Sequence, residues 1–169
     1  MLSDSAVAKP SKLYWGDNHI MSDRKTIPSF GAMLRKALKD AIIPEAGEDF
    51  LAMCADDIVF KFPFTPNESL TEIIGLEAIT RYLAKIGAVL EFESFSDPII
   101  HESKDGETFI LEFSCQGKGT QTAARYDQNY VAVISIQQKR IAQYRDYWNP
   151  LILLEATGGL ETFKESIND

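Results

Sequence analysis

The chain has 169 residues, of which 45% are apolar, and this length fits one domain with a single hydrophobic core. Its formal net charge is -8, which argues against nucleic-acid binding or attachment to an anionic membrane, because both need clustered Lys and Arg. No stretch reaches the length of an apolar membrane span, and the N-terminus lacks the pattern of a signal peptide, so we expect a cytoplasmic protein.

Three parts are expected along the chain. Residues 1–25 are mostly polar and without periodicity, which indicates an N-terminal arm. Residues 26–155 carry the periodic apolar patterns of a folded domain, and residues 156–169 are expected to form a C-terminal tail. From Ser29, apolar residues recur at steps of three and four, which predicts a helix that ends before Pro44.

The rest of the domain predicts one strand, one helix and then a meander of strands. Residues 58–64 alternate with period two, and Leu76 to Leu90 have helical spacing. After Leu90 the chain is strand-like, with a hairpin turn at Asp105-Gly106, a turn at Gly117–Gly119 and a last strand that Pro150 ends. This order predicts an α+β fold with a curved, mainly antiparallel sheet.

Two stretches resemble the nuclear transport factor 2-like superfamily, the SnoaL-like or ketosteroid isomerase-like cone. They are residues 55–64, followed after a loop by 75–79, and residues 139–150. The resemblance implies a cone with three helices on the concave side of the sheet, a cystatin-like roll, with the SnoaL-like domain at 26–155. This fold carries isomerases, dehydratases, cyclases, epoxide hydrolases and binding domains, so the resemblance alone assigns no reaction.

Few catalytic positions of these enzymes are occupied by the same residue here. Ketosteroid isomerases resemble this chain in fold, but their two carboxylates correspond to Phe62 and Val131. Limonene-type epoxide hydrolases carry a similar run on the last strand, and the Asp of that run matches Asp146. Two further members of their water-activating set correspond to Phe113 and Cys115, which disfavours that mechanism.

Strand alternation predicts which side chains face the inside of the cone. If Asp146 points inward, Tyr144 and Trp148 share its face, and under the same alignment Asn129 and Val131 face inward from the neighbouring strand. The expected ligand-binding residues are Phe60, Phe62, Phe64, Tyr82, Phe113, Cys115, Asn129, Val131, Tyr144 and Trp148. An aromatic cavity with few polar groups is typical of a site for a small hydrophobic ligand, and we expect neither a metal nor a cofactor.

A single carboxylate against aromatic walls loses hydration, so the pKa of Asp146 should rise into a range useful for proton transfer. We therefore predict a SnoaL-like enzyme that transfers a proton on a hydrophobic carbonyl substrate, as an isomerase, cyclase or dehydratase, with Asp146 as acid or base. Whether the chain is an enzyme stays open. Asp146 could instead pair with Arg125 or Arg145, and the alternative is a non-catalytic ligand-binding or dimeric scaffold domain of the same fold.

The last expectation concerns oligomerisation. The side chains that alternate with the inward-facing ones on the penultimate strand are expected on the outer face of the sheet; they are Tyr130, Ala132, Ile134 and Ile136. An exposed apolar sheet face usually marks an interface, and members of the superfamily commonly dimerise through it. We therefore expect a homodimer.

Overall fold

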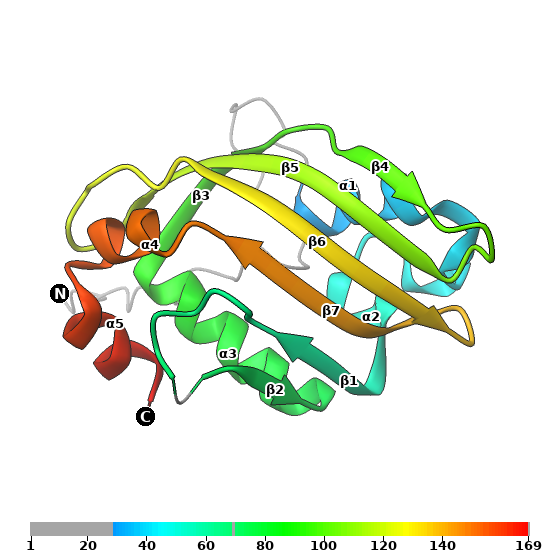
Figure 1. The fold of residues 1–169 in the computed structure, drawn as a ribbon, viewed down its shortest axis with the longest axis horizontal. Helices are drawn as coiled ribbons and strands as arrows, with labels where there is room; N and C mark the ends of the chain where they lie inside the picture. Colours follow the sequence, from blue (N-terminus) through cyan, green and yellow to red (C-terminus); the bar gives the residue numbers. More distant parts are fainter. Residues whose placement is uncertain (1–28, 69, 169) are drawn as a thin grey trace, which may run out of the picture.

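A computed structural model describes residues 29–68 and 70–168, which form one curved, unclosed sheet of seven strands with five α-helices (Figure 1). The α-helices are α1 (Phe30–Leu38), α2 (Phe50–Met53), α3 (Leu76–Val89), α4 (Pro150–Thr157) and α5 (Leu160–Ile167). The strands are β1 (Cys54–Lys61), β2 (Glu72–Ile74), β3 (Leu90–Phe95), β4 (Ile99–Glu102), β5 (Thr108–Gly119), β6 (Gln128–Gln137) and β7 (Arg140–Trp148). The α+β prediction is confirmed. The predicted arm at 1–25 lies outside the described residues.

The sheet is mainly antiparallel. Its strand order is β2-β1-β7-β6-β5-β3, with β4 also paired to β5. Only the β1–β7 pair is parallel among the described strands. Asp105-Gly106 lies in the β4–β5 turn, and Gln138 and Lys139 form the β6–β7 turn with positive φ angles of 49° and 59°. Helices α4 and α5 lie together at the end of the sheet opposite the β6–β7 turn (Figure 1).

Local sequence explains where the helices begin. The Ser29 hydroxyl accepts a hydrogen bond from the Ala32 amide at 3.1 Å and so caps α1. At the other end of the domain, the Asn149 side chain accepts from the Leu151 amide at 3.0 Å, and Pro150 occupies the first turn of α4. Strand β7 therefore stops directly after Trp148, as the sequence predicts. No helix among the described residues is long and apolar enough to cross a membrane.

The core lies between the helices and one face of the sheet. On α1, Met33, Leu34 and Leu38 are buried, and α3 contributes Ile79 and Leu83. The C-terminal residues expected as a tail belong to this core. Helix α5 buries Phe163 and Ile167, and the Lys85 ammonium of α3 donates to the Ile167 carbonyl at 3.2 Å.

The prediction for the face of β6 is wrong. Ala132, Ile134 and Ile136 are buried in the core, whereas Val131 is 39% exposed. Pairing with β7 decides this, because Ala132 lies directly opposite Asp146, and opposite residues of an antiparallel pair share a face. A shift of one residue reverses every side chain of a strand.

The first strand is also shorter than its apolar alternation predicts. Strand β1 ends at Lys61, and Phe64 follows a turn at Pro63. Phe64 is therefore 57% exposed, and its ring contacts Tyr147 edge-on at 5.3 Å.

Gly117 and Gly119 lie within β5 and do not form the predicted turn. A Cβ atom at Gly117 would lie 2.4 Å from the Glu91 carbonyl oxygen, and one at Gly119 would lie 1.8 Å from that of Ala156. At both glycines another segment of backbone approaches too closely for a side chain. Besides turns and bulges, such close approach is a common reason for glycine in a strand.

Candidate functional site

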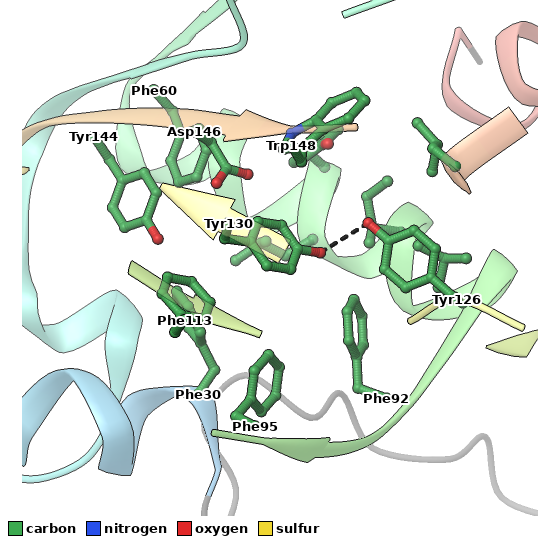
Figure 2. A pocket seen from close by; sticks show the side chains of 15 residues that line it. Phe30, Phe60, Phe92, Phe95, Phe113, Tyr126, Tyr130, Tyr144, Asp146 and Trp148 are labelled. Atoms are coloured by element: carbon green, nitrogen blue, oxygen red, sulfur yellow. Dashed lines mark hydrogen bonds between the residues drawn. The ribbon is translucent and has the colours of Figure 1, made fainter. Parts of the chain in front are cut away.

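A small cavity of about 40 Å³ lies between the core face of the sheet and helices α1, α3 and α4 (Figure 2). Its walls are almost entirely aromatic or aliphatic. They consist of Phe30, Phe60, Tyr82, Leu83, Ile86, Leu90, Phe92, Phe95, Phe113, Tyr126, Tyr130, Tyr144, Asp146, Trp148 and Leu153. This composition is typical of sites for small apolar molecules.

Asp146 is the one carboxylate among these side chains. Figure 2 shows its carboxyl group between Tyr144 and Trp148, its neighbours on the same face of β7. From the sequence, two cations could pair with Asp146, Arg125 and Arg145. Arg145 lies on the other face of β7, and Arg125 is exposed. Arg125 binds Glu93 and Asp127 instead, and no described residue forms an ion pair with Asp146.

Desolvation by burial raises the pKa of Asp146 from its ordinary value of 3.8 to about 8, while a hydrogen bond from the Trp148 side chain acts in the opposite direction. The carboxyl group is therefore mostly protonated at neutral pH. Both the protonated and the ionised form are populated at neutral to mildly alkaline pH. An acid with such a pKa can take up or release a proton under cellular conditions.

Four tyrosine side chains surround this acid. Burial is the largest cause that raises the pKa values of Tyr82, Tyr126, Tyr130 and Tyr144, and the charge of Asp146 contributes to each. All four phenols therefore stay protonated at neutral pH. The hydroxyls of Tyr126 and Tyr130 lie 2.8 Å apart and share a hydrogen bond (Figure 2).

Ring packing holds the walls in place. Tyr144 stacks on Phe60 with ring centres 4.5 Å apart and planes 11° apart. Tyr130 stacks on Phe113 at 5.0 Å and 13°. Such pairs stabilise their rings by about 0.5–1.5 kcal/mol beyond the area that they bury. The cavity is therefore largely preformed.

The structure brings six of the eleven predicted site residues to this cavity: Phe60, Tyr82, Phe113, Tyr144, Asp146 and Trp148. Phe62 and Cys115 are buried but lie behind the wall. Phe62 packs against Phe60 and Tyr82, and the Cys115 thiol donates to the Tyr126 carbonyl at 3.7 Å. Burial raises the pKa of Cys115 to about 11, so its thiol is not ionised at neutral pH.

The other three predicted residues, Phe64, Asn129 and Val131, lie on the outer face of the sheet. They line an open groove of about 710 Å³ together with Ile99 and Tyr147. The prediction that these three side chains face the interior of the cone is wrong. Strand β1 ends before Phe64, and the pairing of β6 with β7 turns Asn129 and Val131 outward.

Sequence reasoning missed Tyr126 and Tyr130, as well as Phe30, Phe92 and Phe95. The sequence alignment places Tyr130 on the outer face, and this prediction is wrong because the register of β6 differs by one residue. An alignment that pairs Tyr130 with Trp148, as in the structure, would have identified Tyr130 as a cavity residue. Tyr126 precedes β6, so no strand periodicity indicates where its side chain lies. In residues 29–68 and 70–168, no group of three or more His, Cys, Asp or Glu side chains is arranged to hold a metal ion.

Comparison with known proteins identifies the family of the chain. The model of the SnoaL-like domain family matches residues 36–144. The uncharacterized protein YesE of Bacillus subtilis is 40% identical over 104 residues, which cover 62% of this chain and 71% of YesE.

Solved structures show the same fold. A Bacillus subtilis protein with a proposed isomerase activity is 33% identical, with a TM-score of 0.63 over 76% of this chain and 94% of that one. An NTF2-like protein from Burkholderia xenovorans is 20% identical, with a TM-score of 0.58 over 75% of this chain and 95% of that one, and shows the fold alone. With its curved sheet and its match to the family model over residues 36–144, this chain belongs to the SnoaL-like domain family.

Proposed function

We propose that the chain is a SnoaL-like enzyme that transfers a proton on a hydrophobic carbonyl compound without a cofactor, as an isomerase, cyclase or dehydratase, and that Asp146 carries the proton. One observation supports this most: Asp146 faces an aromatic cavity, has no cationic partner among the described residues and has its pKa raised to about 8. Structural carboxylates in folded proteins usually have a partner that lowers their pKa.

The chemistry begins with the ionised form of Asp146. Its carboxylate takes a proton from the carbon next to the carbonyl group, and the C–H electrons form the carbon–carbon double bond of an enolate. Return of the proton to a different carbon isomerises the substrate. Alternatively, the enolate electrons form an α,β double bond as the C–O bond of a β-hydroxyl group breaks, and the proton from Asp146 passes to the departing oxygen to give water. The apolar walls solvate the carboxylate less well than bulk water does, so the carboxylate is a stronger base there than in solution.

The test is hydrogen–deuterium exchange of 2-tetralone, a small apolar ketone, in D2O, followed by proton NMR. The wild-type chain should accelerate exchange next to the carbonyl, with a rate that rises with pH until about 8, and Asp146→Asn should lower the rate at least about 100-fold. Asp127→Asn, at an exposed acid paired with Arg125, is the matched control and should retain activity. Equal exchange by wild type and Asp146→Asn would contradict the role of Asp146.

A second candidate is a non-catalytic domain that binds a small hydrophobic ligand. The apolar Phe62, at a position where ketosteroid isomerases have a carboxylate, supports it. In this case the chain binds 2-tetralone, detected by saturation-transfer NMR, but does not accelerate its exchange. Asp146→Asn then binds as well as the wild type.

We also propose that the chain forms a homodimer through the outer face of its sheet. This face exposes the apolar side chains of Ile99, Ile110 and Val131 beside the open groove. The residues that support this proposal differ from those expected from sequence, which face the core.

A further inference from the structure

One wall of the cavity is a row of three aromatic rings that starts at the beginning of α1. Phe30 is the first residue of α1, and its ring lies 5.7 Å from the ring of Phe95, measured between centres. Phe95 in turn stacks on Phe92 at 5.6 Å, with ring planes 20° apart. Figure 2 shows these three rings, here called the aromatic strip, across the cavity from Asp146 and Trp148.

The aromatic strip is accessible at its middle ring. Phe30 and Phe92 are buried, whereas Phe95 is only partly buried, and so is Tyr82, which lines the cavity from α3. The two helices beside the strip pack mainly on other elements, α1 on α2 and α3 on α5 and β1. The partly exposed rings of Phe95 and Tyr82 therefore lie where α1 and α3 make no extensive contact with each other. Apolar side chains that cover such rings stabilise the protein by removing them from water.

The residues that precede α1 contain one cluster of large apolar side chains, Leu13-Tyr14-Trp15. Tyr14 and Trp15 are the only Phe, Tyr or Trp residues among residues 1–28. Aromatic side chains offer a large contact area and pack favourably on other rings. Lys9 and Lys12 lie just before the cluster, whereas the chain as a whole has a net charge of -8, so long-range attraction also draws this segment to the rest of the protein.

The chain connection brings the cluster close to the aromatic strip. Trp15 lies fourteen residues before Ser29, and Ser29 directly precedes Phe30. Fourteen residues reach about 46 Å when extended and average about 20 Å as a random coil. A tether of this length gives the cluster a local concentration in the millimolar range at the strip. The open groove lies on the outer face of the sheet, so the same segment would have to pass around the sheet to reach it.

We propose that Leu13, Tyr14 and Trp15 dock on the aromatic strip of their own chain and complete the wall of the cavity, so that Trp15 contacts a bound ligand. The proposal rests on the ligand-binding cavity of the proposed function and adds three residues of the N-terminal segment to that site. It favours flat, unsaturated ligands, because these pack on the rings of the strip and on the Trp15 indole together.

Fluorine NMR of the full chain labelled with 5-fluorotryptophan tests the docking, because Trp15 and Trp148 are the two tryptophans of the chain. The resonance that disappears in Trp15→Phe belongs to Trp15. We expect this resonance to lie away from its position in the urea-unfolded chain and to shift little between H2O and D2O, as for a buried indole. A Trp15 resonance at the unfolded position in the folded wild type overturns the proposal.

Two matched variants show where Trp15 docks. Phe95→Leu keeps an apolar side chain but removes the partly exposed ring of the strip, so it should shift the Trp15 resonance. Val131→Ala trims an apolar side chain of the outer groove and should leave the resonance in place. The Trp148 resonance reports in each variant whether the domain is folded. A Trp15 resonance that does not respond to Phe95→Leu, or that responds to Val131→Ala instead, overturns docking on the strip.

Ligand affinity tests the contact with the cavity. Titration with 2-tetralone is followed at the Trp148 resonance, because Trp148 lines the cavity and every variant used here retains it. Trp15→Ala should weaken the affinity about 3- to 10-fold, the range for one aromatic contact. Ile20→Ala, at an apolar residue of the same segment outside the cluster, should leave it unchanged. Equal affinity of Trp15→Ala and the wild type, or no binding of 2-tetralone by the wild type, overturns the ligand contact.

These measurements separate the proposal from the role of Asp146, because none of them needs turnover. If ketone exchange is absent but Trp15 is docked and its loss weakens binding, the proton-transfer function fails and the docking of the N-terminal segment stands. If exchange depends on Asp146 but the Trp15 resonance lies at its unfolded position, the docking fails and the function of Asp146 stands.

Discussion

Replacing Asp146 by Asn should make the protein more stable, although it removes the group proposed to do the chemistry. The folded chain holds the Asp146 proton until about pH 8, whereas the unfolded chain releases it near the ordinary value of 3.8. Since the unfolded state gives up its proton first, stability falls as pH rises from about 4 to 8 and is constant above that. Asn has nearly the shape of protonated Asp and no charge to desolvate.

The size of the effect follows from the pKa difference. A difference of about four units corresponds to roughly 5–6 kcal/mol above pH 8, because each unit is worth about 1.4 kcal/mol. Asp146 is only partly buried and faces the cavity, so water reaching it reduces this figure. We expect Asp146→Asn to raise the free energy of unfolding by about 2–4 kcal/mol at pH 8 and by little at pH 4.5.

Urea unfolding followed by circular dichroism at pH 4.5, 6 and 8 measures the effect. The stability difference between Asp146→Asn and the wild type should grow steadily over this range. Asp127→Asn is the control, because Asp127 is exposed and Arg125 lowers its pKa, so it should give no gain that grows with pH. A difference that does not change with pH, or a loss of stability at pH 8, would refute the reasoning.

Three further predictions concern packing, capping and assembly. Gly119→Ala should lower the free energy of unfolding by about 2–4 kcal/mol in urea unfolding, because its Cβ atom would overlap the Ala156 carbonyl; unchanged stability would contradict this contact. Asn149→Ala removes the cap of α4 and should cost about 1 kcal/mol in the same assay, and a loss near zero would show that the cap is dispensable. Val131→Arg should convert the proposed dimer to a monomer in light scattering, while Gln137→Arg, outside the groove, should not; a monomeric wild type would contradict the dimer.

Local sequence predicted the parts of the fold that depend on apolar periodicity and on residues that end helices and strands or form turns. The helix spacing from Leu76, the Asp105-Gly106 turn and the end of the last strand at Pro150 agree with the structure, whereas α1 ends at Leu38, earlier than the predicted end before Pro44. These features are set by residues close together in the chain, such as caps and turn residues, and so they can be read without knowing what packs against them.

Strand faces were harder to predict, and β6 shows why. It is apolar on both faces, with Ala132 and Ile134 on one side and Val131 and Val133 on the other. Alternation then shows which residues share a face but not which face is inside. Only the pairing with β7 decides this, and it moved Tyr130 into the site and Asn129 out of it.

The sequence by itself determined the order of helices and strands, and it placed one acid, Asp146, between two aromatic residues on the last strand. The tertiary structure decided that no described cation reaches this acid, that its pKa rises to about 8, and that the hydroxyls of Tyr126 and Tyr130 meet beside it. Desolvation and hydrogen bonding between segments depend on what the fold brings together, and strand periodicity carries no information about either.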